Sequence, residues 1–463
     1  MLNHFNFKRF NKGFLITNDF GKYLFLKDEE FRNYIGNNIS KDDKLYQTLK
    51  RNYFILESKS DLLADDKIHA LREIKNYLFG STSLHIFAVT NACNLSCIYC
   101  QAKDKSSSLG GFMSLEIGKK AVELALQSPC KDLTFEFQGG EPLLNFDVIK
   151  EMIEESERKK GEKRVQYTMV SNLLALTDEK LEYLAKYNVK VSTSLDGPRN
   201  VQEFNRRMKI PGSSYDVVCE QYKKLQKYGI DGGAIETTTR YSLKYAREIV
   251  DEYIKFGTKG IFIRPLTPLG FAKADWDQLG YAPEEFLGFY RKAFQRILEI
   301  NRGGTVFPEY LATYFLKKIL QGYSFNYMEL RSPCGAVTGQ MSYYYDGSVY
   351  TCDEGRMVSE MGDCAFKLGT VENSYDEIIE SPVCKVTQAA SVIESLPGCS
   401  DCVYQPYCGV CPVVTYAMEK DIFPRGPKGF RCKVYMGIQD FLFELIEEGN
   451  TEVMKILHSW ISE

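Results

Sequence analysis

The chain has 463 residues, 44% of them hydrophobic and 26% charged, a globular composition with room for two or three domains. A formal net charge of −3 gives no bulk attraction to nucleic acid or anionic lipid, so we expect neither nucleic acid nor a membrane as a partner. No apolar run reaches the roughly 20 residues of a membrane span, and the first ten residues lack a signal-peptide core, so we expect a cytoplasmic protein. In a reducing compartment its fourteen cysteines predict metal ligation rather than disulfides.

Short strand-like runs open the chain, around Phe7, at residues 14–17 and at residues 22–26, with turn-forming residues between them. Helical patterns follow at residues 28–35 and 41–51. We therefore expect a small module of sheet and helices over residues 1–80.

Residues 81–305 alternate strand and helix. The apolar runs that predict strands lie at residues 84–89, 133–137, 165–170, 189–195, 234–238 and 261–263. Ser114, Asn145 and Thr177 precede amphipathic segments and are predicted helix caps. Six such units predict an α/β fold with a partial (β/α)6 TIM-like barrel, whose functional loops lie at the carboxyl ends of the strands.

Beyond the barrel, helices are predicted at residues 283–301 and 311–321, the second within a helical bridge of residues 306–330. Nine of the fourteen cysteines lie between Cys334 and Cys432. We expect metal centres rather than a large apolar core to organise residues 331–445, and a final helix over residues 446–463.

Cys93, Cys97 and Cys100 directly follow the first barrel strand. Three thiolates on a [4Fe–4S] cluster leave one iron free, and that iron can chelate S-adenosylmethionine (SAM) for reductive cleavage to a 5′-deoxyadenosyl radical. The alternative is a structural zinc site with a fourth ligand such as His85.

At these cysteines the sequence resembles the radical SAM superfamily. Gly139, Gly140 and Glu141 follow the second strand and match the family's Gly-Gly-Glu segment, which implies that they hold the SAM ammonium group. Tyr99 stands where family members often carry an aromatic beside the adenine, although a packed core aromatic is an alternative interpretation.

Polar residues also end the third and fourth strands. The resemblance implies that Ser171 and Asn172 reach the SAM ribose hydroxyls, and that Ser194 and Arg206 contact the SAM carboxylate. A surface arginine or a helix cap is the alternative for the last pair.

The cysteine-rich tail resembles the SPASM domain, which carries two auxiliary [4Fe–4S] clusters. The resemblance assigns an outer cluster to Cys399, Cys402, Cys408 and Cys432. It assigns an inner cluster, nearer the barrel, to Cys334, Cys352 and Cys411. One departure is visible, because two residues separate Cys408 from Cys411 where the family pattern has three.

The fourth ligand of the inner cluster stays open between Cys364, Cys384, water and substrate. A zinc ribbon on the two Cys-x-x-Cys pairs is the competing interpretation of the tail. Cys130, Cys219 and Cys384 have no motif context and are expected to be buried thiols.

Asp353 directly follows Cys352, where an Asp acts as catalytic base in the related enzymes that oxidise a sulfatase residue. The resemblance therefore implies a catalytic base at Asp353, against an ordinary solvated carboxylate. Arg264, at the last barrel strand, is either a substrate contact or part of a structural ion pair.

The whole chain resembles radical SAM/SPASM maturases of ribosomally made peptides, and is most similar to the His-Xaa-Ser system maturases. Its amino-terminal module resembles peptide recognition elements, which bind a leader peptide as an added strand. We therefore expect hydrogen abstraction from a precursor peptide and formation of an intramolecular C–C or C–heteroatom crosslink. This activity implies SAM, three [4Fe–4S] clusters, a leader-bearing peptide and an electron donor such as a flavodoxin or a ferredoxin.

Two alternatives remain open. The first is oxidation of a Ser or Cys side chain to formylglycine, as in anaerobic sulfatase maturation. The second, of another class, is a zinc-stabilised peptide-binding protein without catalysis.

Overall fold

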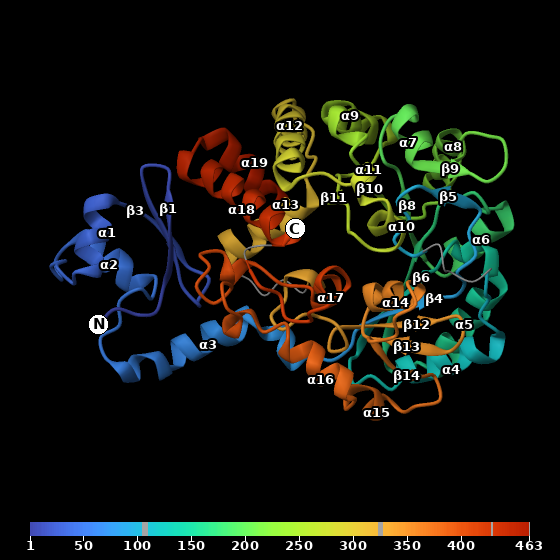
Figure 1. Cartoon of the computed structure of the whole chain (residues 1–463), viewed down its shortest axis with the longest axis horizontal. Coiled ribbons are helices and arrows are strands. Elements are labelled where there is room, and N and C mark those ends of the chain that lie inside the picture. The colour runs from blue at the N-terminus through green and yellow to red at the C-terminus, as the bar shows by residue number, and fades with distance from the viewer. Residues whose placement is uncertain (104–109, 323–326, 427–428, 463) are drawn as a thin grey trace.

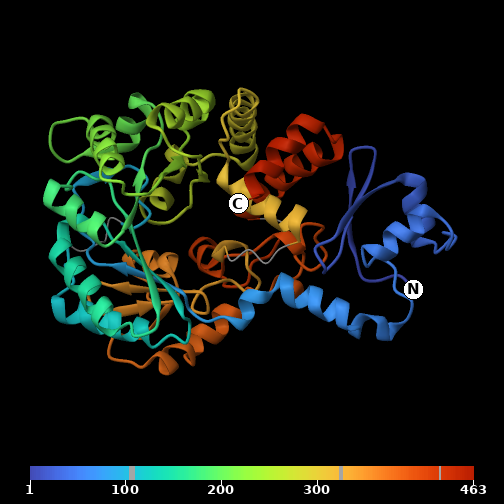
Figure 2. The same cartoon turned by 180° about the vertical axis from the view of Figure 1, so that it is seen from behind.

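The computed structural model describes residues 1–103, 110–322, 327–426 and 429–462. A small amino-terminal module lies at one end of the molecule and a large parallel sheet at the other, with the carboxyl-terminal helices between them (Figures 1 and 2). Within these residues, no helix combines the length and the apolar character that crossing a bilayer requires.

The amino-terminal module is an antiparallel sheet of β1 (Asn6–Phe10), β2 (Gly13–Thr17) and β3 (Tyr23–Lys27), in that order. Helices α1 (Asp28–Ile35) and α2 (Lys44–Arg51) follow and cover one face, where Phe14 and Phe31 stack at 3.9 Å. Helix α3 (Asp65–Ile74) then leads to the barrel (Figure 1). The predicted strands and helices of this module are confirmed, within a few residues.

The barrel prediction is also confirmed. Its parallel strands are β4 (Leu84–Ala88), β6 (Asp132–Gln138), β7 (Arg164–Val170), β8 (Lys190–Ser194), β10 (Ala234–Thr238) and β11 (Ile263–Pro265). The intervening helices are α4 (Leu115–Leu126), α5 (Phe146–Lys159), α6 (Asp178–Lys186), α7 (Arg199–Asn205), α8 (Ser214–Lys227) and α9 (Ala246–Phe256). Odd residues of β6 are apolar and buried in the core, while even residues are polar, so this strand has one apolar and one polar face.

Ser114, Asn145 and Thr177 each occupy the N-cap position of their helix, as predicted, but only two of them cap it with the side chain. Ser114 and Thr177 each accept a hydrogen bond from the first turn of their helix. The side chain of Asn145 instead donates to the carbonyl oxygens of Val89 and Met113, at 2.9 and 3.0 Å. Asn145 therefore ties two loops together at the carboxyl end of β4.

The sheet does not end with the six barrel strands. A strand from the cysteine-rich region, β12 (Gln340–Tyr344), pairs in parallel with β4, and β13 (Ser348–Tyr350) and β14 (Lys367–Thr370) extend the sheet to nine strands. The nine-stranded sheet therefore contains strands from both sides of the expected domain boundary at residue 331. Of the short elements nearby, β5 (Leu95–Cys97) pairs with β9 (Arg206–Met208), and α14 (Asp353–Glu360) follows β13.

Helix α12 (Pro283–Arg302) is confirmed, and α13 (Tyr310–Leu316) continues as a π-helical turn to Gln321. The short helices α10 (Gly270–Ala274) and α11 (Trp276–Leu279) lie between β11 and α12. The tail also contains α15 (Tyr375–Ile379), α16 (Pro382–Ala389), α17 (Pro412–Glu419), α18 (Phe430–Glu448) and α19 (Thr451–Ile461).

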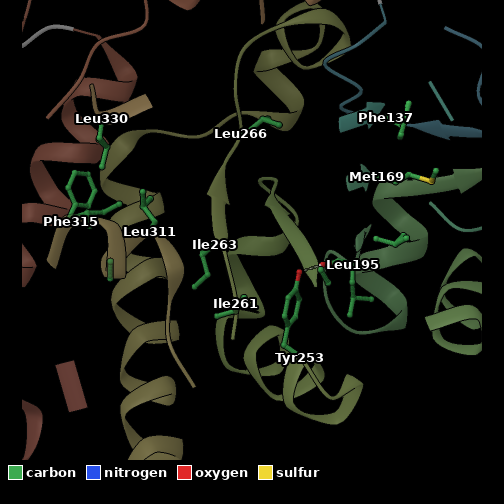
Figure 3. Packing of buried hydrophobic residues seen from close by; sticks show 14 of the residues in the cluster. Phe137, Met169, Leu195, Tyr253, Ile261, Ile263, Leu266, Leu311, Phe315 and Leu330 are labelled. Atoms are coloured by element: carbon green, nitrogen blue, oxygen red, sulfur yellow. Dashed lines mark hydrogen bonds between the residues drawn. The ribbon is translucent and has the colours of Figure 1, made fainter. Parts of the chain in front are cut away.

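The expectation that metal centres rather than an apolar core organise residues 331–445 is wrong for α18, which packs in the main core together with α19. Phe441 of α18 and Trp460 of α19 pack edge-on against Phe294 of α12, at 5.0 and 5.4 Å. The core they enter also holds Leu311 and Phe315 of α13 and the end of the barrel sheet (Figure 3). Apolar burial therefore anchors this part of the tail to the barrel.

Candidate active site and auxiliary centres

The first group of thiols lies beyond the carboxyl end of β4. Pairing of β5 with β9 sets Cys97 directly opposite Arg206. Burial raises the pKa of Cys97 to about 12, while Arg206 lowers it and Cys100 and Cys93 raise it. Burial also raises the pKa of Cys93 to about 11, with Cys100 among the minor causes. The three thiols therefore affect one another's pKa, and Cys97 lies opposite a cation.

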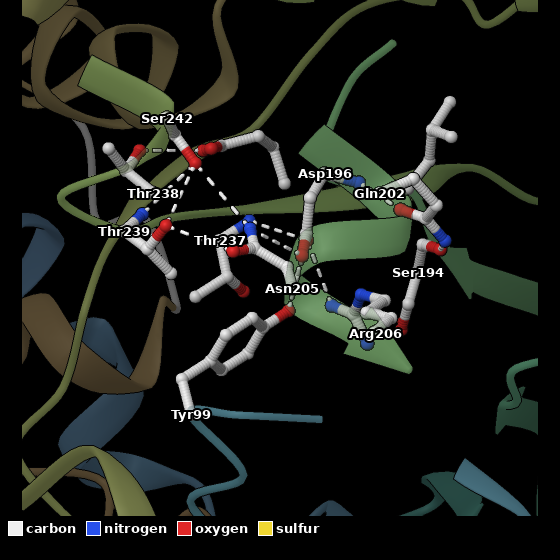
Figure 4. Close-up of polar contacts among 12 residues, drawn as sticks. Tyr99, Ser194, Asp196, Gln202, Asn205, Arg206, Thr237, Thr238, Thr239 and Ser242 are labelled. Atoms are coloured by element: carbon white, nitrogen blue, oxygen red, sulfur yellow. Dashed lines mark hydrogen bonds and ion pairs between the residues drawn. The ribbon is translucent and has the colours of Figure 1, made fainter. Parts of the chain in front are cut away.

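A buried carboxylate organises the residues behind these thiols (Figure 4). Asp196, which has no exposed surface, accepts hydrogen bonds from the Tyr99 hydroxyl at 2.8 Å, Arg206 at 3.0 Å, Asn205 at 3.1 Å and the Thr237 amide at 3.2 Å. The Arg206 guanidinium also lies 5.2 Å from the centre of the Tyr99 ring. Tyr99 is thus fixed through its hydroxyl, and Arg206 is held by an anion on one side.

The remaining side of Arg206 has capacity for another anion. The side chain is 11% exposed, and within the described residues its Nε has no hydrogen-bond partner. A buried guanidinium donor beside a thiol group fits a bound carboxylate such as that of SAM. Ser194, at the end of β8, is half-buried, and its backbone oxygen accepts from Gln202.

Two backbone segments pack so closely at Gly139 and Gly140 that glycine is required at both positions. The amides of Gly140 and Glu141 donate to the carbonyl oxygens of Thr90 and Ala92 at 2.7 and 2.8 Å. A Cβ at Gly139 or Gly140 would overlap those same carbonyl oxygens, and Gly139 has a φ of +149°. The glycines therefore lock the end of β6 to the segment that leads into Cys93.

Glu141 is buried and accepts three hydrogen bonds, from the Ser171 hydroxyl at 2.7 Å, the Asn172 amide at 2.8 Å and the Leu143 amide at 3.0 Å. Burial raises the pKa of this carboxyl, and those hydrogen bonds oppose the rise. The Asn172 side chain donates to Asn94 at 2.8 Å and lies 3.6 Å from the Cys93 sulfur. The predicted SAM contacts of β6 and β7 are thus one connected unit against the first thiols.

The four outer cysteines line a single cavity. This cavity has a volume of about 90 Å³ and its wall includes Cys399, Cys402, Cys408 and Cys432. Burial raises the pKa of Cys432 to about 12, with further contributions from Cys408, Cys402 and Cys399. The four cysteines that the resemblance assigns to the outer cluster therefore line the same cavity.

The amino-terminal sheet is bonded to the same loop. The Asn6 side chain donates to the carbonyl oxygens of Ser400 and Cys402 at 2.9 and 3.1 Å, and the Thr17 hydroxyl donates to that of Val403 at 2.7 Å. The module is thus attached directly to the backbone of the outer cysteines.

The three inner cysteines pack with Leu269 and Val413, and Cys334 and Cys352 are buried there. Cys411 is partly buried and also lines the cavity of the outer cysteines. The Cys352 sulfur accepts from the Gly355 amide at 3.4 Å.

The two candidate fourth ligands lie elsewhere. Cys364 is exposed, and Cys384 packs in the main core rather than with the inner cysteines. Neither residue therefore joins the inner thiols in this structure.

Asp353 is held in an ion pair, because its Oδ1 lies 2.8 and 2.7 Å from two nitrogens of the buried Arg356. Arg264 lies 3.5 Å from Glu329, which also binds Arg431 at 3.0 Å. Asp353 and Arg264 therefore each have an ion-pair partner, and both lie beside the inner cysteines.

Sequence reasoning missed Glu136, a carboxylate on the polar face of β6 that hydrogen-bonds to Gln138 and Thr168. Burial raises its pKa, Asp353 raises that pKa further, and Gln138, Thr168 and Arg264 lower it. The signal was an acidic residue within a strand that alternates apolar and polar residues.

Among residues 1–103, 110–322, 327–426 and 429–462, no three Cys, His, Asp or Glu side chains are gathered closely enough to hold one metal ion. His85, the suggested zinc ligand, instead packs against Phe135 and bonds to the Tyr343 hydroxyl at 2.9 Å inside the core. A four-iron cluster distributes its thiolates over different irons. Three separate all-thiol groups therefore fit such clusters in donor chemistry.

Comparison with known proteins agrees with this geometry. Residues 87–256 match the model of the radical SAM superfamily. The Cysteine-type anaerobic sulfatase-maturating enzyme of Clostridium perfringens is 27% identical over 282 residues, which cover 58% of this chain and 74% of that protein. An uncharacterized protein of Methanocaldococcus jannaschii is 31% identical over 184 residues, which cover 40% of this chain and 62% of that protein's length.

Two solved structures share the fold. The structure described as native anSMEcpe with bound AdoMet has a TM-score of 0.68 at 20% identity, covering 80% of this chain and 99% of its own. Streptococcus suis SuiB bound to precursor peptide SuiA has a TM-score of 0.56 at 15% identity, covering 92% of this chain and 99% of its own. Residues 87–256 therefore match a radical SAM domain, and the chain shares the α/β fold of these two structures.

Proposed function

We propose that this enzyme modifies a ribosomally made precursor peptide, by abstracting a hydrogen atom and installing an intramolecular C–C or C–heteroatom crosslink. The observation that carries the proposal is the sorting of ten cysteines into one group beyond β4 and two groups in the tail. We assign a [4Fe–4S] cluster to each group. Within the peptide maturases, the His-Xaa-Ser system type remains our proposed subclass.

The residues around the first group would hold SAM, whose reductive cleavage supplies the hydrogen-abstracting carbon radical. Arg206, already positioned by Asp196, would bind the SAM carboxylate through its uncommitted Nε. Glu141 would receive the ammonium group, and Ser171 and Asn172 would face the ribose. Tyr99 would lie beside the adenine.

The peptide leader would add to the amino-terminal sheet, where β1 and β3 are edge strands that pair only with β2 among the described strands. Phe7 of β1 is 54% exposed, which leaves apolar surface beside one edge. The two auxiliary clusters would accept the electron that remains after bond formation, and a flavodoxin or a ferredoxin would reduce the first cluster.

The test is co-expression with short neighbouring open reading frames, followed by mass spectrometry of each peptide. A crosslink lowers the peptide mass by two hydrogens, and tandem spectra locate the joined residues. An unmodified peptide, with SAM cleavage intact, would argue against the crosslinking activity.

Formylglycine formation is the second candidate, since Asp353 follows Cys352 beside the inner group. Its product differs, because oxidation of a Cys also removes sulfur from the peptide. The third candidate, a zinc-stabilised peptide binder, predicts dominant zinc in anaerobically purified protein, and iron with acid-labile sulfide would exclude it.

A further inference from the structure

Strand β9 brings exposed cations next to the first thiols. It pairs with β5, and Cys97 lies directly opposite Arg206. Successive side chains of a strand point to opposite faces, and accordingly Arg206 is buried while Arg207 is exposed. The Lys209 side chain is also exposed, and it donates a hydrogen bond to the carbonyl oxygen of Cys93 at 2.7 Å. Two exposed cations therefore lie beside the loop that carries the first cysteines.

A row of cationic and aromatic side chains continues from Arg207 over the neighbouring loops. The Arg207 guanidinium lies 5.6 Å from the centre of the Phe204 ring, which is 37% exposed and stacks on Tyr241 at 4.0 Å. The Lys244 ammonium group lies 4.3 Å from the centre of the Tyr241 ring. These four residues and Lys209 form one surface, which we call the cationic face.

The positive charge of the cationic face is not neutralised within the described part of the chain, where none of its three cations forms an ion pair. Glu203, the residue before Phe204, and Asp216 of α8 are both paired with Arg199 instead, at 3.2 and 2.7 Å. Exposed positive charge attracts an anionic partner and speeds its association. Aromatic and arginine side chains are enriched in protein interfaces, so the rings of this face favour a protein over a small anion.

We propose that the cationic face is the docking surface for an acidic one-electron carrier protein, which reduces the first cluster. The proposal rests on the proposed function, because it requires a [4Fe–4S] cluster at the first cysteines. In the complex the reduced carrier loses one electron and the cluster gains it, and no bond forms or breaks. The strand β9 and the helix α7 lie at the opposite end of the molecule from the amino-terminal sheet (Figure 1). The carrier and a leader peptide can therefore bind at the same time.

The test uses the full-length protein loaded with iron and sulfide, and the probes are a purified acidic flavodoxin and a purified acidic ferredoxin. Calorimetry measures binding of each oxidised carrier, and 5′-deoxyadenosine formed without peptide measures SAM cleavage driven by each reduced carrier or by dithionite. Arg207→Glu combined with Lys244→Glu should weaken carrier binding by about tenfold and lower carrier-driven cleavage. Dithionite-driven cleavage should stay unchanged, because a small reductant needs no docking surface. Added salt should weaken carrier binding by the unmodified protein.

Lys223→Glu combined with Lys227→Glu is the matched control. Both lysines are exposed in the second half of α8, outside the cationic face, and their reversal changes the net charge equally. This control should bind the carrier like the unmodified protein. Equal carrier binding by the unmodified protein and by the Arg207 and Lys244 variant would overturn the proposal, and so would equal weakening in the control. A protein that cleaves SAM with dithionite but binds neither carrier would overturn it as well.

If the reversed variant also loses dithionite-driven cleavage, Arg207→Gln combined with Lys244→Gln should keep that cleavage and still weaken carrier binding. Unchanged binding in this milder variant would overturn the proposal. Failure of the unmodified protein to cleave SAM even with dithionite would refute the first cluster and the proposed function, and this case is recognised before any variant is made. A peptide that is not crosslinked leaves the result unaffected, because SAM cleavage is measured without peptide.

Discussion

Deleting the amino-terminal module should remove the proposed outer auxiliary cluster as well as the proposed leader binding. A chain that starts at Ser81 loses the two hydrogen bonds from Asn6 and the one from Thr17 to the backbone of residues 400–403. It also uncovers Phe443, a buried ring against which Tyr23 and Phe25 pack. The loop that carries Cys399 and Cys402 would thus lose these hydrogen bonds and the nearby ring contacts.

The magnitude follows from these contacts. Water reaches the three carbonyl oxygens once the module is gone, so each lost hydrogen bond costs about 0.5–1.5 kcal/mol, and uncovering Phe443 costs roughly 1.5–3 kcal/mol. Together these losses approach the lower end of the stability of many domains, about 5–15 kcal/mol. We therefore expect the truncated chain to bind about four fewer irons, and its inactivity would not by itself demonstrate a leader-binding role.

The assay is iron and sulfide content together with electron resonance, for the truncated chain and for two point variants. Asn6→Ala should destabilise the outer cluster towards oxygen or chelator. Arg9→Gln is the matched control, since Arg9 is on the same strand but bonds to the exposed Asp28, a pair worth at most about 1 kcal/mol. A truncated protein with its full iron content and an unchanged outer signal would refute the reasoning.

Three further predictions concern single side chains. Arg206→Gln should weaken SAM binding about tenfold to a hundredfold, measured by calorimetry, because a charge-assisted bond is worth about 1.5–3 kcal/mol, whereas the exposed neighbour Arg207→Gln should not. Burial raises the pKa of Glu309 from 4.5 to about 7 in the folded protein. The folded state therefore binds this proton more tightly than the unfolded state, and the resulting stabilisation is fully present below about pH 4.5. The free energy of unfolding should fall by about 3 kcal/mol from this group as the pH rises from about 4.5 to about 7. The denaturation midpoint of Glu309→Gln should vary less with pH across that window than the midpoint of the unmodified protein. An equal pH dependence of the two midpoints would contradict the assignment. Asp353→Ala should lower stability by about 3–5 kcal/mol by leaving Arg356 unpaired, and Asp353→Ala with Arg356→Met should recover stability in thermal unfolding but not product formation if Asp353 is also the base.

The barrel was predictable because its signals are local. Runs of buried apolar residues, each followed by an amphipathic helix, identify parallel strands, and the loops after them carry Cys93, Gly139 and Ser171. Strand β12 was missed, although Asp346-Gly347 between two tyrosine-rich runs is a hairpin signal. Its parallel partner β4 lies more than 250 residues earlier in the chain, and no local pattern can indicate such a pairing.

The candidate site could be predicted in its residue types but not in its pairings. Sequence motifs cannot tell whether Asp353 or Glu354 receives the guanidinium of Arg356, but helix geometry can, because residues three apart share a face and residues two apart do not. The deficit of one cysteine at the inner group was visible in the sequence.

The short spacing between Cys408 and Cys411 leads to the last prediction. The two residues belong to different groups, outer and inner, and the backbone between them passes directly against residues 329 and 330. A Cβ at the buried Gly409 would overlap the Glu329 carbonyl oxygen and lie 2.8 Å from the Leu330 Cα, which are backbone atoms that cannot move aside like a flexible side chain.

Gly409→Ala should therefore displace the loop that would supply one ligand to each proposed auxiliary cluster, and we expect a loss of about eight irons with the proposed SAM-binding cluster retained. Gly288→Ala is the control, because Gly288 is exposed on α12 with open space around its Cβ position, and alanine there should stabilise the helix by about 1 kcal/mol. Iron content and SAM cleavage measure the two outcomes separately. Full auxiliary iron in Gly409→Ala would show that this loop can move away from residue 329, and that the short spacing is not held in place by that contact.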